Sequence, residues 1–278
     1  MHWYEAILLG LIQGLTEFLP VSSSGHLEIG KVLLGVETTD DLLFTTMVHA
    51  ATVLSTILVF RKQIWDLLKG FFSGLKGIRV EKGTLVCNDQ TDYLMKMVVS
   101  MIPIFVVGVF FKDQVEGLFG SIKVVGGALL ATSALLFFSD MSSRPGKAVK
   151  ENAYRNGISY WQALVVGLGQ SLAVIPGLSR SGTTISTGLI CGVRREVMAQ
   201  FSFLMVLVPI LGETFLEVVG GEFGVSSVGA LPLLLGFGSA FLSGLFACKV
   251  MIALVKKARL SWFALYCLIA SAAIFIFA

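Results

Sequence analysis

The chain has 278 residues, of which 55% are hydrophobic and 14% are charged, and its formal net charge is +3. Long apolar runs in this composition exclude a soluble domain and predict an all-α polytopic membrane protein. The basic residues fall between the apolar runs, so they bear on membrane orientation and do not indicate nucleic-acid binding. Four cysteines without paired spacing argue against a metal cage or a disulfide framework: Cys87, Cys191, Cys248 and Cys267.

The chain begins with two apolar runs that are too short to span a bilayer. Residues 5–19 and 27–36 flank a polar loop, Pro20 to His26, and a spanning helix needs about 20 residues. We therefore predict a re-entrant helix–loop–helix. Its polar tip is tolerated at membrane depth because it is buried in protein or lines a cavity.

Three spanning helices are expected in the rest of the first half, at residues 42–60, 94–111 and 122–138. In the connection after the first span, residues 64–76 combine apolar side chains, both aromatic and aliphatic, with charged ones. This pattern fits either an amphipathic helix on the membrane surface or an ordinary loop helix. A polar linker follows at residues 139–159.

The second half repeats the first at a constant offset of 157 residues, with eleven identities and no gap. Short runs at 161–175 and 183–193 precede spans at about 201–219, 231–255 and 261–277. We predict one integral membrane domain, residues 1–278, made of repeat one (1–138), the linker and repeat two (160–278). Because each repeat has one re-entrant pair and three spans, an odd number, the second repeat is expected to be inverted.

The charges of the loops provide an independent prediction of topology. Fifteen Lys and Arg residues fall on one predicted side of the membrane and three on the other. The positive-inside rule makes the basic side cytoplasmic and puts both chain termini outside.

A polar stretch interrupts the hydrophobic second half at Pro176 to Thr184, which reads P-G-L-S-R-S-G-T-T. Arg180 has a high cost in a bilayer unless it faces a partner or a cavity. Glycines that allow close approach, and a following helix with free N–H groups, favour an anion site. The candidate binding residues are Ser179, Ser181, Gly182, Thr183 and Thr184.

The first-half loop carries the complementary groups. Gln13 and Glu17 are four residues apart and share one helix face, which leads into the polar loop. If the two tips meet at the membrane midplane, they form a set suited to hydrolysis or to anion binding. Glu17 is the candidate metal ligand, since Mg²⁺ is commonly held by one carboxylate plus phosphate oxygens. The loop residues are Ser22, Ser23, Ser24, Gly25 and His26.

These motifs resemble those of the bacterial undecaprenyl-diphosphate phosphatases, a family also known for bacitracin resistance. The resemblance rests on Q-G-L-T-E at Gln13 to Glu17, on the loop Ser22 to His26 and on Pro176 to Thr184, and it covers essentially the whole chain. It departs from the family at Gln13, where many members have Glu. A scheme that uses two carboxylates from this helix is therefore in doubt.

The resemblance implies hydrolysis of a C55 polyprenyl diphosphate lipid to the monophosphate, which recycles the carrier for cell-wall synthesis. It also implies a divalent cation, Mg²⁺ or Ca²⁺, and a multi-pass protein among the lipids of the bacterial inner membrane with its site toward the outer face. We assign catalytic roles to Glu17, Ser23, His26 and Arg180. The nucleophile stays open among Ser23, His26 and water. Predicted substrate contacts are Gln13, Ser22, Ser24, Gly25, Ser179, Ser181, Gly182, Thr183 and Thr184.

An alternative function uses the same features. A lipid-phosphate transporter or flippase would have the same inverted repeat and central anion site, but it would release no phosphate. An enzyme that also moves its lipid is a further alternative. The oligomeric state, including a homo-oligomer, is left open. We interpret His49, within a predicted span, as a packing residue or as one that supports the site indirectly, and not as a ligand.

Overall fold

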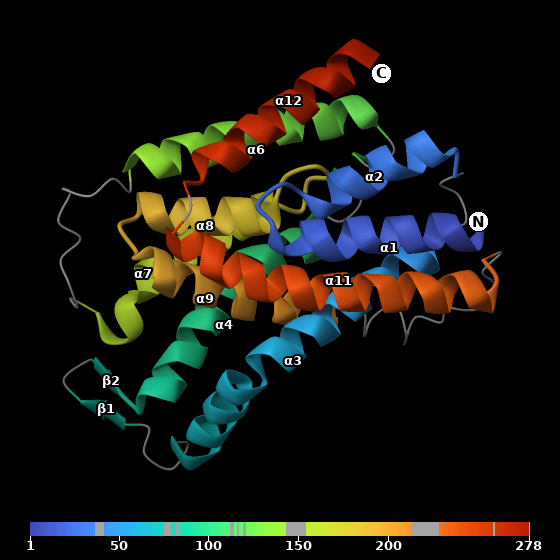
Figure 1. Cartoon of the computed structure of the whole chain (residues 1–278). Coiled ribbons are helices and arrows are strands. Elements are labelled where there is room, and N and C mark those ends of the chain that lie inside the picture. The colour runs from blue at the N-terminus through green and yellow to red at the C-terminus, as the bar shows by residue number, and fades with distance from the viewer. Residues whose placement is uncertain are drawn as a thin grey trace.

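The computed structural model describes residues 1–36, 42–74, 79–81, 84–111, 114–115, 117–118, 121–142, 154–212, 228–257 and 259–277. The described chain is a bundle of helices with one small antiparallel hairpin, β1 (Arg79–Glu81) and β2 (Thr84–Val86) (Figure 1). Five of the described helical stretches are long and apolar enough to cross a membrane: Leu43–Gly74, Asp89–Phe110, Ile122–Ser142, Arg195–Gly212 and Ala230–Met251. The predicted all-α membrane architecture is confirmed.

The two predicted helix–loop–helix pairs are present. α1 (Trp3–Phe18) and α2 (Ser23–Leu34) form the first, and α7 (Tyr160–Leu172) and α8 (Arg180–Ile190) form the second. Figure 1 shows α2 running back along α1. With 16 residues, α1 is about 24 Å long, which is less than the roughly 30 Å of a hydrocarbon core.

Proline and two serine caps determine where these helices end and begin. Pro20 has no N–H and restricts Leu19, which is extended at φ −74°, ψ 143°, so α1 stops there. The second helix of each pair begins earlier than the sequence pattern predicted, at Ser23 and at Arg180. The reason is that Ser22 and Ser179 act as N-caps. The loops are therefore shorter than expected, and Arg180 is the first residue of a helix.

α3 (Leu42–Gly74) is a continuous helix of 33 residues. It joins the predicted span at 42–60 to the described part of the amphipathic segment at 64–76. That segment is thus an extension of the spanning helix and not a separate helix. At 1.5 Å per residue α3 is about 50 Å long, so it extends well beyond a hydrocarbon core.

The remaining helices are α4 (Asp89–Phe110), α6 (Ile122–Ser142), α9 (Arg195–Met205), α11 (Ala230–Lys257) and α12 (Ser261–Phe277), with a short 3₁₀ turn, η3 (Arg155–Gly157), before α7. α6, α11 and α12 fall close to their predicted ranges, whereas α4 and α9 begin earlier than the predicted starts at residues 94 and 201. α12 has 17 residues, so it is an apolar helix slightly shorter than the five candidate spans. The end of the span predicted at 201–219 lies outside the described residues.

Helices from the two halves of the chain pack against each other through small residues. α1 lies along α11, where a Cβ on Gly10 would be 2.0 Å from Ser239 Oγ and 2.4 Å from the carbonyl oxygen of Gly236. α7 lies along α4, where a Cβ on Gly167 would be 2.2 Å from the carbonyl oxygen of Ser100. Contacts this close require glycine and are typical of membrane helix interfaces. They hold the two halves together around the polar loops.

Candidate functional site

The polar loops of the two halves are in direct contact. The amide of Gly177 donates to Ser24 Oγ at 3.3 Å, and Ser181 Oγ donates to the carbonyl oxygen of Leu19 at 3.2 Å. These partners are about 150 to 160 positions apart in the chain. The predicted meeting of the two tips is therefore confirmed.

The two loops are also built in the same way. Ser22 Oγ accepts from the amide of Gly25 at 3.2 Å, and Ser179 Oγ accepts from the amide of Gly182 at 3.1 Å. Both capping serines lie 3.4 Å from the hydroxyl of the serine two residues later. All of these residues correspond at the offset of 157.

These caps change the expected phosphate contacts. The N–H groups of Gly25 and Gly182 are bound to the capping serines and do not point freely at a ligand. By contrast, the amides of the first two residues of α2 and α8 make no hydrogen bond within the part of the chain that the structure describes, as is usual for the first turn of a helix. These four open amides belong to Ser23, Ser24, Arg180 and Ser181.

The loop before α2 is strained at Ser22. Its φ of 73° lies in the left-handed region, and Ser22 and Asn156 are the non-glycine residues with positive φ among those described. Such a conformation costs on the order of 1–3 kcal/mol and is kept where the surroundings enforce it, often at functional sites. The strained backbone directs the next residue, Ser23, toward α1.

Glu17 and Ser23 form the shortest polar contact of the site. Ser23 Oγ donates to Glu17 Oε2 at 2.5 Å, and Gln13 Nε2 donates to the same oxygen at 2.9 Å. A short O–H···O⁻ bond of this kind is charge-assisted and polarises the hydroxyl. Of the described residues, none hydrogen-bonds to Glu17 Oε1. The arrangement can deprotonate the serine while one carboxylate oxygen stays available.

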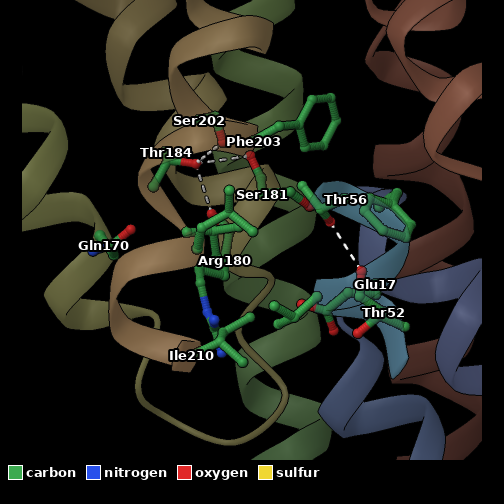
Figure 2. A pocket seen from close by; sticks show the side chains of 14 residues that line it. Glu17, Thr52, Thr56, Gln170, Arg180, Ser181, Thr184, Ser202, Phe203 and Ile210 are labelled. Atoms are coloured by element: carbon green, nitrogen blue, oxygen red, sulfur yellow. Dashed lines mark hydrogen bonds between the residues drawn. The ribbon is translucent and has the colours of Figure 1, made fainter. Parts of the chain in front are cut away.

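Arg180 lies on the opposite side of a small cavity from this pair. The cavity has a volume of about 20 Å³, and Glu17, Gln170 and Arg180 are among its lining residues (Figure 2). Arg180 Nη1 is buried without a hydrogen-bond partner. A volume of this size holds about one water molecule. A diphosphate can enter only if the surrounding helices separate.

Several hydroxyl and amide groups at the second loop make hydrogen bonds that join helices to one another. Thr184 Oγ1 lies 2.6 Å from Ser202 Oγ of α9 and donates to the carbonyl oxygen of Arg180 at 2.9 Å. The amide of Ser179 donates to Thr132 Oγ1 of α6 at 3.1 Å. Thr183 Oγ1 is buried without a partner among the described residues. The structure thus gives Thr184 and Ser179 packing contacts in addition to their predicted contacts with substrate.

His26 points away from Ser23. Its Nδ1 donates to the carbonyl oxygen of Ser22 at 2.7 Å, since that carbonyl can only accept, and its Nε2 lies 2.6 Å from the hydroxyl of Tyr266 in α12. The two rings are stacked, with centroids 5.5 Å apart. Hydrogen bonds from His26 to Ser23, Glu17 and Arg180 are absent from the described structure. His26 and Ser23 are therefore not hydrogen-bonded to each other in this conformation.

Comparison with known proteins identifies the family. The sequence matches the family described as "Bacitracin resistance protein BacA" over residues 6–273. A Bacteroides thetaiotaomicron protein named "Undecaprenyl-diphosphatase" is 50% identical over 280 residues, which cover 99% of each chain. Proteins of the same name from Christiangramia forsetii and Salinibacter ruber are 46% and 40% identical, over 100% and 96% of this chain and 99% and 96% of their own.

The chain belongs to the BacA family. The resemblance seen in the motifs at Gln13 to Glu17, Ser22 to His26 and Pro176 to Thr184 is confirmed by matches over nearly the full length. In this BacA family member the motifs come together at one place, the contact between the two loops.

The oxygen donors of this BacA site fit a hard divalent cation held mainly by substrate. The described residues contain no group of three or more His, Cys, Asp and Glu side chains that could form a complete cage. Glu17 supplies one carboxylate, and the amide oxygens of Gln13 and Gln170 are buried without partners. Mg²⁺ is usually bound by one or two carboxylates together with substrate phosphates and water, so this donor set is sufficient.

Two features of the BacA site were missed in the sequence. α3 contributes Thr52 and Thr56 to the cavity, and His49, three residues before Thr52, interacts electrostatically with the Glu17 carboxylate. The Nδ1 atom of His49 lies 2.8 Å from the carbonyl oxygen of Thr45, and the interpretation that His49 packs or supports the site indirectly stays a prediction. The i, i+3, i+7 spacing of these polar residues on an apolar helix was the available signal. The second missed residue is Gln170, which lies at the repeat position of Gln13.

Proposed function

We propose that this chain hydrolyses undecaprenyl diphosphate to undecaprenyl phosphate and inorganic phosphate, and that it thereby recycles the lipid carrier and confers bacitracin resistance. Membership of the BacA family and relatives named "Undecaprenyl-diphosphatase" support this function. The observation that carries it is the hydrogen bond from Ser23 to Glu17 across a cavity from Arg180. A nucleophile, a base and a fixed positive charge are what phosphoanhydride hydrolysis requires.

The reaction follows from the positions of these groups. Arg180 and the four open amides of α2 and α8 bind the terminal phosphate. Glu17 accepts the proton of Ser23, and Ser23 Oγ attacks the terminal phosphorus as the bond to the bridging oxygen breaks. The lipid monophosphate leaves with that oxygen. Glu17 passes the proton it took from Ser23 to the leaving oxygen, which restores the carboxylate. Water then attacks the phosphoserine: Glu17 takes a proton from the water, the hydroxyl bonds to phosphorus, and the proton returns to Ser23 Oγ as the bond from that oxygen to phosphorus breaks.

A divalent cation, Mg²⁺ or Ca²⁺, belongs to this proposal. Oε1 of Glu17 is available to hold it, because Ser23 and Gln13 both donate to Oε2. When bound, the cation neutralises charge on the phosphates. His26 is expected to act on protons away from the Ser23–Glu17 pair, since its ring is bound to Tyr266.

The test is to trap the intermediate. Purified protein is mixed with farnesyl diphosphate labelled in the terminal phosphate, quenched in acid within the first turnover, and analysed for labelled peptides. We expect phosphate on Ser23 and none in Ser23→Ala. Ser24→Ala is the matched control, because Ser24 is the adjacent hydroxyl and contacts Gly177 instead of Glu17. Label on His26, or release of phosphate with no adduct, would contradict the assignment.

The membrane arrangement is part of the proposal. The predicted inverted repeat, with the site and both termini on the outer side, is supported by the unequal loop charges and by the matching caps at Ser22 and Ser179. Fusing alkaline phosphatase to the C-terminus tests it. An active fusion is expected, since this reporter folds only outside the cytoplasm. An inactive alkaline phosphatase, with a fluorescent green fluorescent protein at the same position, would contradict it.

One observation also favours lipid transport. The loops of two helix–loop–helix pairs meet, and helices from both halves of the chain line a small cavity, as in carriers that open alternately to each side. An assay in proteoliposomes, with the substrate added outside, distinguishes hydrolysis from transport. Phosphate release identifies the enzyme, and movement of a fluorescent lipid phosphate between leaflets, without phosphate release, identifies the carrier.

A further inference from the structure

Two buried polar groups face the same cavity without hydrogen-bond partners. Gln170 Oε1 and Arg180 Nη1 are both buried and unpaired among the described residues, and both side chains line the cavity beside Glu17 (Figure 2). The exposed fraction of Gln170 is 0%. Leaving two buried polar groups without partners has a free-energy cost, so these groups indicate that a ligand binds in this cavity.

The orientation of the Gln170 amide follows from its other contact. Nε2 donates to the sulfur of Met101 at 3.7 Å, and that sulfur can only accept. The opposite orientation would turn the carbonyl oxygen toward the sulfur and lose this bond. Gln170 therefore presents an acceptor to the cavity, whereas Arg180 presents a donor.

An acceptor at this position does not suit a phosphate alone. A phosphate bound to Arg180 carries negative oxygens, and these repel the carbonyl oxygen of Gln170. A divalent cation removes the conflict, because it binds phosphate on one side and neutral or charged oxygen ligands on the other. Glu17 supplies the carboxylate for the same ion. The cavity lining then presents acceptor oxygens from Glu17 and Gln170 and donor N–H groups from Arg180.

The first repeat contains the same feature. Gln13 corresponds to Gln170 at the offset of 157, is also 0% exposed and also has an unpaired amide oxygen. Its Nε2 is bound to Glu17. Two buried glutamines with open carbonyl oxygens, one from each half, are more than packing of the helices requires.

We propose that Gln170 is a ligand of the divalent cation, through Oε1, and that it shares the ion with Glu17 and with the phosphates bound at Arg180. This inference rests on the cation proposed above. It adds to the site a residue outside the three motifs, and it explains why a buried amide faces an anion-binding cavity with its acceptor end.

The experiment measures Mn²⁺ binding without turnover. The full chain in detergent is titrated with Mn²⁺ in the presence of farnesyl methylenediphosphonate, and free Mn²⁺ is followed by electron paramagnetic resonance. Mn²⁺ prefers the same hard oxygen ligands as Mg²⁺. We expect Gln170→Leu to weaken Mn²⁺ binding at least about tenfold. Gln170→Glu is expected to keep the affinity of the native chain or exceed it, since a carboxylate is the stronger ligand.

Met101→Leu is the matched control, because it alters the other side of the same amide and is expected to leave the Mn²⁺ affinity within about twofold, well below the loss expected for a ligand. Unchanged Mn²⁺ binding in Gln170→Leu would overturn the proposal. So would an equal loss in the Leu and Glu variants, which would mean that the amide N–H binds phosphate. If Gln170→Leu does not fold, weakened binding in Gln170→Glu overturns it. If the native chain did not bind Mn²⁺, the proposal that the site holds a divalent cation would also be wrong. The result of the Ser23 trapping test would not depend on that outcome.

Discussion

At the scale of single residues, the site depends on which atoms are already bonded. Oε2 of Glu17 takes both available hydrogen bonds, from Ser23 and Gln13, while Arg180 Nη1 and Gln170 Oε1 take none. One carboxylate thus has an oxygen committed to the serine and another available to a cation. The absence of a second carboxylate at Gln13 is consistent with this division, since the amide N–H of Gln13 supports Glu17 as a donor.

Replacing Glu17 tests this pairing. Glu17→Gln keeps the shape of the side chain but removes the base, so kcat should fall about 10²- to 10⁴-fold. Because Glu17 and Ser23 act as one unit, the double variant Glu17→Gln with Ser23→Ala should be no slower than Ser23→Ala alone. Phosphate release from farnesyl diphosphate measures both. If the two losses multiplied, the residues would be acting independently.

At the scale of elements, close helix packing positions the loops. α1 and α11 approach so closely that a Cβ on Gly14 would lie 2.0 Å from Ser243 Oγ and 2.5 Å from the carbonyl oxygen of Ala240. A backbone carbonyl cannot turn aside as a side chain can. Since α1 carries Gln13 and Glu17, a shift of this helix would also move the carboxylate away from Ser23.

Replacing each of two glycines with alanine distinguishes the effect of helix packing on stability from the effect of helix propensity. Gly14→Ala should lower the free energy of unfolding by about 1–3 kcal/mol because α1 and α11 must separate. Gly127→Ala in α6 is the control, since its Cβ would meet nothing within 4 Å. That change should be neutral or stabilising by up to about 1 kcal/mol. Thermal unfolding in detergent measures both, and equal effects would argue against the close α1–α11 contact.

The N-cap of α2 permits a second test at this scale. Ser22 combines a cap with a φ of 73°, so Ser22→Ala should lose the cap and keep the strain, at a cost of about 1 kcal/mol or more. Ser22→Gly should cost less, because glycine adopts positive φ without strain. Unfolding measurements that find glycine worse than alanine would contradict the left-handed backbone at this residue.

At the scale of the whole molecule, polar contacts between helices from both halves hold the bundle together at a distance from the site. Asp140 at the end of α6 accepts from Arg195 Nη2 of α9 at 2.6 Å, and also from the amide of Leu260 and the hydroxyl of Ser261 at the start of α12. One carboxylate thus joins three helices. By contrast, the ion pair between Asp89 and Arg155 is exposed.

Replacing Asp140 and replacing Asp89 should lower the free energy of unfolding by different amounts. Asp140→Ala breaks several charge-assisted bonds and should lower the free energy of unfolding by about 1.5–3 kcal/mol. Asp89→Ala should cost less than about 1 kcal/mol because its ion pair is solvated. Denaturant or thermal unfolding of both variants in detergent checks the ranking. A larger loss for Asp89→Ala would contradict the role of Asp140 as the junction of α6, α9 and α12.

The sequence by itself determined the local features of this protein. Apolar length predicts the helices, the polar stretches Pro20 to His26 and Pro176 to Thr184 mark where they break, and the repeat at offset 157 identifies Ser22 and Ser179 as equivalent. These features depend on residues within one or two turns of each other, so they can be read along the chain. The same part of the sequence information includes the three motifs on which the resemblance to the family rests, and the match over residues 6–273 confirms that family.

Only the tertiary structure decided which side chains meet. His26 is bound to Tyr266, 240 residues away, and not to Ser23. Gln170 and Glu17 both line the cavity, and α3 contributes Thr52 and Thr56 to it. No local pattern specifies such pairs, because they depend on how close α1 and α11, or α4 and α7, can pack at their glycines. The positions of the helices along the chain follow from local sequence, whereas the partners of each polar side chain follow from how the helices pack.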